Sequence, residues 1–307
     1  MDSCQAKQVE NVSIVVTHYR TPELLRACLV RLNAHAPDCQ VVVVDTSSDG
    51  EPLPEEVSRV HLLKVPNHSM ANAVNAGLKM ATGELILQMN ADVMLNADTL
   101  PALVEQIKMP QVGMVGPSCR TPSGDWQNQG LLYHPYYAYL ELTGRSSVRV
   151  PWLSGCCQLI RRDVLEQVGG LDSSFRFYNE DMEWCWRLRE ADYHCKLVAT
   201  EVLHVGGAST PPEDARFLLE GFRGGMVLSQ CYKPRWYRLA HHWTMRLYAT
   251  LKSKFAEDAA TRKLYTDIAR MFAAERFAES PFGETLNEDN PEFGRGWLEA
   301  SPTAPER

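Results

Sequence analysis

Three carboxylates open a helix-like segment in the second half of the chain, FYNEDMEWCWRLRE at residues 177–190. If Asn179 is the N-cap, Asp181 and Trp184 share one face of this helix, whereas Glu180 lies on another. The helix dipole and the free N–H groups of a first turn stabilise an ionised carboxylate, so Asp181 is a candidate proton acceptor. Simple capping by these acids is the alternative, because acidic residues are common at helix N-termini.

Polar side chains also stand directly after strand-like runs in the first half of the chain. Thr17 and Tyr19 close VSIVVTHY, Asp45 closes QVVVVD, and Asn90 closes ELILQMN. In doubly wound sheets, ligands bind outside the carboxyl ends of the strands, so these side chains are expected at one ligand site. Asp45 could accept a hydrogen bond from the N–H of a pyrimidine base there. The alternative for Asp45 is to cap the turn that follows its strand.

Asp92 and His204 are the candidate ligands of a divalent cation. Asp92 follows the same strand as Asn90, and its carboxylate oxygen suits Mg²⁺ or Mn²⁺ beside a nucleotide diphosphate. His204 stands just before Gly206-Gly207, where it could bind the metal or contact a phosphate. A turn residue and a structural histidine are the respective alternatives.

Strand-like and helix-like segments alternate through the first half of the chain, and they must position these side chains. A helix is expected from Pro22, with Thr21 as its cap, and a second helix at 70–80 is expected to take Gly83 as its C-terminal cap. The alternation predicts an α/β fold with a doubly wound, mostly parallel sheet flanked by helices. No G-x-G-x-x-G follows the first strand, so the standard dinucleotide motif is missing. The expected strands are 12–17, 40–45, 60–65 and 84–89.

The second half of the chain has a different pattern. Residues 116–149 are rich in aromatic residues, Gly and Pro, and they predict either a mobile acceptor-binding loop or an irregular element packed by its own aromatic rings. A strand is expected at 153–160 and a short helix at 162–168. A largely helical C-terminal extension is expected at about 212–279, before an irregular, loosely held tail at 281–307.

The composition is that of an ordinary globular protein. Of 307 residues, 45% are hydrophobic and 22% are charged, which is enough to bury a full core. The net charge of -7 gives no global basic field, so nucleic acid is not expected as a partner. The cysteines are odd in number and contain no C-x-x-C pair, which argues against a disulfide framework and a cysteine-rich zinc site. Without a signal-peptide core or a long apolar run, a cytoplasmic protein is expected.

A series of short motifs runs in order between Val12 and His204: VSIVVTHY, VVVVD, NAVNAG, ATGE, LQMNAD, WLSG, RR, GGLD and NEDMEWC. This order resembles the inverting family 2 glycosyltransferases of the GT-A fold, over roughly residues 12–209. By this resemblance, residues 1–210 form the glycosyltransferase domain and 211–280 the helical extension. The domain would divide into a nucleotide-sugar half at about 11–117 and an acceptor half at about 118–210.

The resemblance implies a role for each candidate residue in a metal-dependent sugar transfer of the hexosyltransferase type. Asp181 would be the general base that deprotonates the attacking hydroxyl, and Glu180 would orient the acceptor. Asp92 and His204 would hold Mg²⁺ or Mn²⁺, which neutralises charge on the leaving nucleoside diphosphate. Trp184 would pack beneath the site or stack on a sugar. The remaining donor-binding candidates are Thr17, Tyr19, Asp45, Asn75 and Asn90, and the remaining acceptor-binding candidates are Trp152 and Gly155.

Asn90 departs from the fuller metal motif of the family, which has two aspartates separated by one residue. The form with a single aspartate resembles a subgroup that includes many rhamnosyltransferases. The expected donor is dTDP-rhamnose or a UDP-sugar, since a base-reading Asp45 suits both nucleotides. The expected acceptor is a glycan or a lipid-linked sugar of polysaccharide or cell-envelope biosynthesis.

Two other functions compete with this one. A catalytically silent sugar-nucleotide-binding or scaffold protein of the same fold is favoured by Asn90 and disfavoured by the retained acidic and histidine candidates. A nucleotidyltransferase needs a glycine-rich, basic phosphate loop near the N-terminus, and the sequence has none.

The C-terminal extension mixes basic and aromatic residues at 233–238 and 241–255. Such a surface could face a membrane that bears a lipid-linked acceptor, which would place the protein at the inner face of that membrane. Packing against the catalytic domain and a contact in a homo-oligomer are the alternatives.

Overall fold

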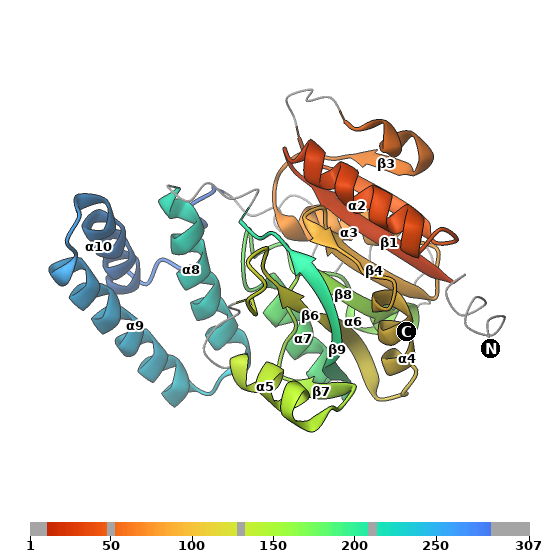
Figure 1. Cartoon of the computed structure of the whole chain (residues 1–307). Coiled ribbons are helices and arrows are strands. Elements are labelled where there is room, and N and C mark those ends of the chain that lie inside the picture. The colour runs from red at the N-terminus through yellow and green to blue at the C-terminus, as the bar shows by residue number, and fades with distance from the viewer. Residues whose placement is uncertain (1–10, 48–52, 128–132, 208–213, 284–307) are drawn as a thin grey trace, which may run out of the picture.

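The computed structural model describes residues 11–47, 53–127, 133–207 and 214–283. Its elements form an α/β unit and a group of C-terminal helices beside it (Figure 1). The predicted tail beyond residue 283 lies outside the described residues. The strands are β1 Val12–His18, β2 Gln40–Asp45, β3 His61–Lys64, β4 Leu85–Asn90, β5 Val93–Met94, β6 Val112–Arg120, β7 Ser147–Val150, β8 Cys157–Arg161 and β9 His194–His204. The helices are α2 Pro22–His35, the 3₁₀ helix η1 Glu55–Arg59, α3 Met70–Met80, α4 Thr99–Ile107, α5 His134–Thr143, α6 Arg162–Val168, α7 Glu180–Glu190, α8 Ala215–Tyr232, α9 Arg235–Phe255 and α10 Ala259–Ala273.

A nine-stranded sheet forms the centre of the α/β unit, in the order β3-β2-β1-β4-β8-β6-β9-β5, with β7 paired to β9. Strands β3, β2, β1 and β4 run parallel, as the alternation of strands and helices predicts. Strand β8 then lies antiparallel between β4 and β6, and β5 and β7 are both antiparallel to β9. The predicted α/β sheet flanked by helices is confirmed, and its second half is mixed rather than parallel.

Each central strand alternates its side chains between two layers of helices. In β1, Ile14 and Val16 pack in the core formed with α2 and α4, whereas Val15 packs in the core formed with α3, α5, α6 and α7. Because both faces of the sheet are covered, its strands are continuous apolar runs in the sequence rather than alternating ones.

Helix α3 ends differently from the prediction. It ends at Met80 with Ala81 as its C-cap, at φ -67°, so Gly83 is not the cap. Gly83 instead lies where the chain turns into β4, and a Cβ atom there would come within 2.6 Å of the Asn11 carbonyl oxygen. Close approach of two backbone segments, not helix termination, explains this glycine.

The predicted strand at 153–160 is also shorter, because β8 begins only at Cys157. The loop before it makes one backbone bond to β4, from the Asn90 N–H to the Cys156 carbonyl at 2.9 Å, and glutamine side chains bond to two more of its carbonyl groups. Gln158 Nε2 donates to the Leu153 carbonyl at 2.9 Å, and Gln88 Nε2 donates to the Gly155 carbonyl at 2.7 Å. This loop is therefore fixed in place without belonging to the sheet.

The aromatic segment at 116–149 contains the end of β6, helix α5 and strand β7 within its described residues. Trp126 stacks on Tyr137 with ring centroids 4.5 Å apart, and Tyr133 and Tyr137 are each only 1% exposed. Of the two predicted alternatives, the described residues fit an element packed by its own aromatic rings.

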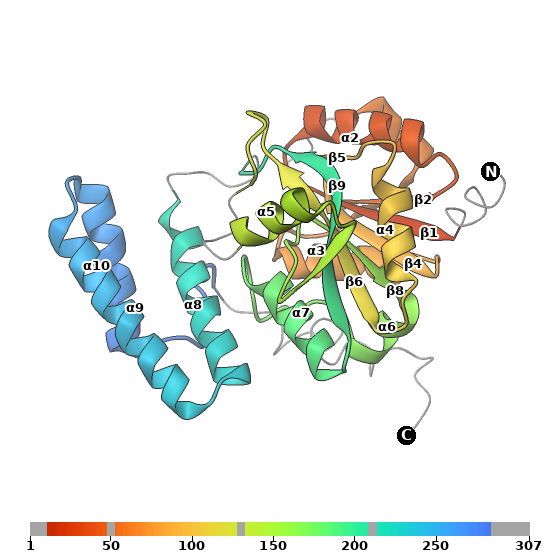
Figure 2. The same cartoon turned by 60° about the horizontal axis from the view of Figure 1, so that its bottom comes forward.

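The C-terminal helices α8, α9 and α10 share a small core of their own, formed by Met226, Ala249, Ile268, Phe272 and Phe277. Helices α9 and α10 form a hairpin that lies farthest from the sheet in both views (Figures 1 and 2). Helix α8 stands between this hairpin and the α/β unit.

Candidate active site

The carboxyl ends of β1, β2 and β4 bring predicted donor-binding residues to one edge of the sheet. The strand register pairs Thr17 with Asn90 and His18 with Asp45. Thr17 Oγ1 donates to Asn90 Oδ1 at 3.2 Å. Thr17, Tyr19 and Asn90 line a cavity, whereas Asp45 is buried just behind its wall.

Asp45 is oriented by His18, which lies between the predicted site residues Thr17 and Tyr19 at the end of the first strand. The Thr21 N–H donates to His18 Nε2 at 3.0 Å, so the imidazole proton is on Nδ1, where it donates to Asp45 Oδ1 at 3.2 Å. The Ser47 N–H donates to the same oxygen at 2.9 Å, which is the turn-capping contact. Among the described residues both bonds use Oδ1, which leaves Oδ2 as an acceptor for a ligand.

Asp92 and His204 meet because β5 pairs with β9 so that Val93 lies opposite His204. His204 Nε2 lies 3.4 Å from Asp92 Oδ1, and the Gly206 N–H donates to Asp92 Oδ2 at 3.0 Å. On the other side of the ring, His204 Nδ1 lies 2.7 Å from Gln127 Oε1. Burial tends to raise the pKa of Asp92, but the hydrogen bond and the charge of His204, with the Gly206 N–H, outweigh it and lower that pKa.

This pair fits a divalent cation in its chemistry, because it places a carboxylate oxygen and an imidazole nitrogen together on the cavity wall. In the described part of the chain, no group of three or more His, Cys, Asp or Glu side chains could hold a metal ion. Asp92 and His204 would therefore share the ion with phosphate oxygens and water, which Mg²⁺ commonly keeps in nucleotide sites.

Asp181 lies in the first turn of α7 and faces the same cavity. The Gly155 N–H donates to its Oδ2 at 2.8 Å, and the Met182 N–H donates to Oδ1 at 2.7 Å. Gly155 can approach this closely because it has no side chain; a Cβ atom would lie only 3.1 Å from Asp181 Cβ. Burial raises the pKa of Asp181 to about 6, although these N–H groups act to lower it. Asp181 is thus ionised at neutral pH and able to accept a proton.

Glu180 lies beside Asp181, and one of its carboxyl oxygens is buried without a hydrogen bond in the described part of the chain. Its side chain is 8% exposed, and Oε2 has no hydrogen-bond partner among the described residues. Burial, and next the charge of Asp181, raise the pKa of Glu180 to about 8, so it retains its proton at neutral pH. A buried oxygen without a partner at a cavity is a place where a ligand hydroxyl can bind.

The turn before α7 has an unusual backbone. Tyr178 and Asn179 have φ values of 68° and 71°, in the left-handed region that costs a non-glycine residue roughly 1–3 kcal/mol. Asn179 occupies the predicted N-cap position, but its side chain makes no capping bond. Its Nδ2 donates instead to the Gly221 carbonyl of α8 at 3.0 Å, and a Cβ atom at Gly224 would come within 2.5 Å of that nitrogen. Glycines of α8 therefore allow the helix to pack directly on the turn that carries the acids.

A buried ion pair of α8 holds the segment before α7 in place. Glu220 and Arg223 are 0% and 2% exposed, and Arg223 Nη2 lies 2.6 Å from Glu220 Oε1. Arg223 also donates to the Ser174 carbonyl at 2.6 Å and to the Phe277 carbonyl at 3.0 Å, and the Arg176 N–H donates to Glu220 Oε1 at 3.0 Å. The sequence signal for this network is an i, i+3 Glu–Arg pair, which is too common to identify it alone.

The two predicted acceptor-site tryptophans do not line the cavity. Trp184 is 0% exposed, and its Nε1 donates to the Gly169 carbonyl at 2.9 Å, so it packs beneath the site, the first of its two predicted roles. The carbonyl of Trp152 accepts from Tyr133 Oη at 3.0 Å, and its ring packs 5.0 Å from that of Tyr133.

Asn75, a predicted donor-binding residue, is fully buried in α3 and does not line the cavity. Its Nδ2 donates to the Leu171 carbonyl at 2.8 Å, and the Leu171 N–H donates back to Oδ1 at 2.8 Å. This pairing ties α3 to the segment after α6, so we do not assign Asn75 to the donor site.

The cavity that the remaining candidates share has a volume of about 780 Å³, within the usual range for a small-molecule site. Part of its wall comes from the C-terminal extension, through Arg216, Phe217 and Phe282, which the sequence analysis missed. Arg216 Nη2 pairs with Asp214 at 2.6 Å, and its guanidinium lies 4.9 Å from the Phe282 ring. The predicted residues that line this cavity are Thr17, Tyr19, Asn90, Asp92, Gly155, Glu180, Asp181 and His204.

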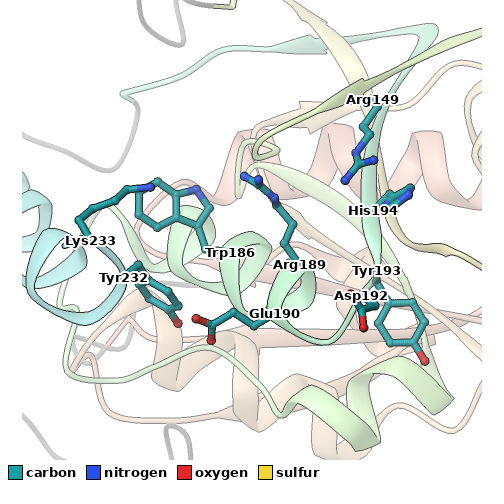
Figure 3. Close-up of a pocket in the computed structure, with 9 residues that line it drawn as sticks. All are labelled: Arg149, Trp186, Arg189, Glu190, Asp192, Tyr193, His194, Tyr232 and Lys233. Atoms are coloured by element: carbon teal, nitrogen blue, oxygen red, sulfur yellow. The ribbon is translucent and has the colours of Figure 1, made fainter. Parts of the chain in front are cut away.

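A smaller pocket of about 320 Å³ lies at the opposite end of α7 (Figure 3). Arg149, Arg189 and Lys233 are among the residues that line it, and Lys233 Nζ lies 4.0 Å from the centroid of the Trp186 ring. Acidic side chains of the same lining, Glu190 among them, offset these cations. The pocket contains none of the predicted site residues.

The model of the family described as "Glycosyl transferase family 2" matches residues 13–169, just over half of the chain. That range contains the sheet edge with Thr17, Asp45, Asn90 and Asp92, and it ends before α7. The family match therefore covers the sheet-edge side of the cavity, and the residues of α7 and α8 lie beyond it.

Several proteins of known name are similar in sequence. O-antigen biosynthesis protein RfbC of Myxococcus xanthus is 30% identical over 64% of this chain, which spans only 17% of that protein. Low-salt glycan biosynthesis hexosyltransferase Agl10 of Haloferax volcanii is 25% identical over 70% of this chain and 73% of its own length. N-acetylglucosaminyl-diphospho-decaprenol L-rhamnosyltransferase of Mycobacterium tuberculosis is 28% identical over 58% of this chain and 65% of its own length.

A solved structure, GalNAc-T7 with UDP, GalNAc and Mn²⁺, matches with a TM-score of 0.60 at 15% identity. The match covers 89% of this chain and 58% of that one. At this identity the likeness establishes the fold, and it extends past the family match into the C-terminal half.

Proposed function

The chain belongs to glycosyl transferase family 2, and on that basis we propose that it is an inverting enzyme. It transfers a sugar from a nucleotide-diphosphate donor to a hydroxyl of a glycan or a lipid-linked acceptor. The observation that carries this proposal is that one cavity holds both an Asp92–His204 pair and an ionised Asp181 held by Gly155. A nucleotide-binding protein without catalysis needs the first feature only.

In the proposed reaction, Asp181 accepts the proton of the acceptor hydroxyl as that oxygen attacks the anomeric carbon of the donor. Attack from the side opposite the nucleoside diphosphate inverts the configuration at that carbon. Glu180, which retains its proton, donates a hydrogen bond that orients the acceptor. A divalent ion held by Asp92 and His204 would supply neutralising charge for the diphosphate oxygens.

On the donor side, Asp45 Oδ2 accepts the N–H of a pyrimidine base, and Thr17, Tyr19 and Asn90 contact the rest of the nucleotide. A buried carboxylate fits uracil and thymine equally, because both present a ring N–H. The relatives named as a rhamnosyltransferase and a hexosyltransferase support dTDP-rhamnose or a UDP-sugar as the donor. The neighbour solved with UDP and Mn²⁺ supports a metal-dependent reaction.

We place this activity in the cytoplasm, with peripheral contact to the inner face of a membrane. The relative that acts on a diphospho-decaprenol sugar supports a lipid-linked acceptor in polysaccharide or cell-envelope biosynthesis. Among the described residues, no helix combines the length and the apolarity needed to cross a bilayer.

The first experiment measures donor hydrolysis and thermal shift on the purified protein with dTDP-, UDP- and GDP-sugars, with and without Mg²⁺ or Mn²⁺. We expect one pyrimidine donor to stabilise the protein and to be hydrolysed slowly when a metal is present. A silent sugar-nucleotide-binding protein, favoured by Asn90, would show the same stabilisation without any hydrolysis or transfer to supplied acceptors.

A further inference from the structure

Helix α9 presents an apolar stripe to solvent. Large side chains recur every three or four residues along one side of the helix, so they share a face. In the whole helix only Ala249 is buried. The residues of this stripe are Trp236 (69% exposed), Leu239 (51%), Trp243 (59%), Leu247 (59%) and Leu251 (45%).

The opposite side of α9 is already packed. Ala249 and Met245 contact the small core that includes Ile268 and Phe272 of α10. The Tyr248 ring packs 5.8 Å from that of Tyr265 in α10. The helix is thus held in the hairpin by its other side, and none of the five stripe residues belongs to the small core.

The charge of α9 is opposite to that of the chain. The helix has no Asp or Glu, whereas the chain as a whole carries a net charge of -7. A helix with an exposed apolar face, two exposed tryptophans and only basic charged residues has the composition of an interfacial helix. Its cations are Arg235, Arg238, Arg246, Lys252 and Lys254.

We propose that this face of α9 lies flat on a bilayer that contains anionic phospholipids. Trp236, Trp243 and the leucines insert at the level of the headgroups. Arg235, Arg246 and Lys254, which helical spacing places within or beside the stripe, meet the lipid phosphates. The membrane contact of the proposed function then has a defined surface, although binding to lipid does not require the transfer reaction.

A second copy of the chain fits this face less well. In a two-fold dimer the same surface meets itself, so two helices with only positive charges would be brought together. An anionic bilayer instead compensates the charge and buries the apolar stripe at once.

The test is sedimentation of the full chain with two kinds of vesicle, phosphatidylcholine alone and phosphatidylcholine mixed with phosphatidylglycerol, at low and moderate salt and without any donor. We expect binding to the anionic vesicles only, weakening as salt rises. Leu247→Glu is expected to reduce the partition coefficient about tenfold or more, because it removes an apolar side chain and adds a repelled charge.

The matched control is Leu142→Glu, the same change at a leucine of α5 that is 86% exposed. It is expected to bind vesicles as the unchanged chain does, and both variants should keep the same Tm because neither leucine is buried. The proposal is overturned if no vesicle binds at low salt, or if the two variants weaken binding equally. It is also overturned if ultracentrifugation shows a dimer that only Leu247→Glu dissociates and no lipid binding occurs. Donor hydrolysis, measured separately, is unaffected by these outcomes.

Discussion

The two ends of the cavity treat their carboxylates in opposite ways. At the sheet edge, Asp92 has a histidine as its neighbour, and this partner lowers its pKa in spite of burial. At the start of α7, Asp181 and Glu180 have each other and little solvent, and burial raises the pKa of both. The residue type is nearly the same, and the environment sets the chemistry.

This contrast shows how one cavity can hold a fixed charge and a transferable proton. A carboxylate that stays ionised over the whole physiological range suits a metal ion. A carboxylate with a pKa closer to neutral is a stronger base and can take a proton from a hydroxyl. This difference in pKa depends on the surroundings of each carboxylate, which are His204 for Asp92 and the buried first turn of α7 for Asp181.

The largest effect is expected from Asp181→Asn, which removes the proposed base but keeps the shape of the side chain. Turnover should fall by about 10²–10⁴-fold, because general-base assistance is lost. Donor affinity, measured by calorimetry, should not change, since the sheet edge is untouched. Asp192→Asn, at an exposed position, is the control. A variant that retains full turnover would show that Asp181 is not the base.

The next largest effect is expected from Arg223→Met, which breaks the buried ion pair with Glu220 in α8 and leaves the sheet edge unchanged. Glu220 would remain buried without its partner, so the free energy of unfolding should fall by about 3–5 kcal/mol in urea denaturation. Lys263→Met, at a side chain that is 84% exposed, should change it little. If the two changes have equal effects, the network does not stabilise the segment before α7.

A smaller effect is expected from Asp92→Asn, which removes the carboxylate charge from the proposed metal site. Affinity for Mn²⁺ in the presence of the nucleoside diphosphate should fall roughly 10–100-fold, the loss typical of a damaged metal site. Electron paramagnetic resonance of free Mn²⁺ measures it directly. Asp181→Asn should leave Mn²⁺ affinity unchanged, and a loss in both variants would mean that the two ends are not independent.

The smallest change concerns the pH profile. Because Asp181 must be ionised to act as the proposed base, kcat/KM should fall about tenfold per pH unit below its pKa of about 6. The plateau at higher pH should end above the pKa of about 8 of Glu180, which must keep its proton to orient the acceptor. In Glu180→Gln this acidic limb should remain near the same pH, since Glu180 is already protonated there. A limb that moves by a full pH unit would show that the two acids titrate as a strongly coupled pair.

The sheet edge could be predicted well from the sequence because local signals determine it. Buried strands are apolar runs, their ends are polar residues, and parallel register brings those ends together, as with Thr17 and Asn90. The position of α7 and its opening carboxylates also followed from the pattern. The antiparallel placement of β8 did not, since an apolar strand has the same pattern in either direction.

The rest of the candidate site depends on contacts between distant segments. Nothing near Asn179 indicates that its amide bonds to Gly221 rather than capping its own helix. Arg216, Phe217 and Phe282 show no feature that separates cavity lining from ordinary surface. The hydrogen bonds between Asn75 and Leu171 likewise join residues far apart in sequence. The motif NAVNAG therefore suggested a donor contact for Asn75, whereas its side chain bonds to the backbone of a distant segment.

The cavity wall at Phe282, with the bond from Ser280 Oγ to Glu220 Oε2 at 2.9 Å, has a consequence for how the protein is made. A ribosome releases the chain from its N-terminus, and segments fold as they emerge. The sheet edge can form while the C-terminal helices are still being translated. The segment before α7 completes its contacts with the extension only after residue 282 has left the exit tunnel. Nascent chains would therefore form the sheet-edge part of the cavity well before its wall is complete. Premature termination within α10 would leave a chain with the sheet edge but without the wall at Phe282.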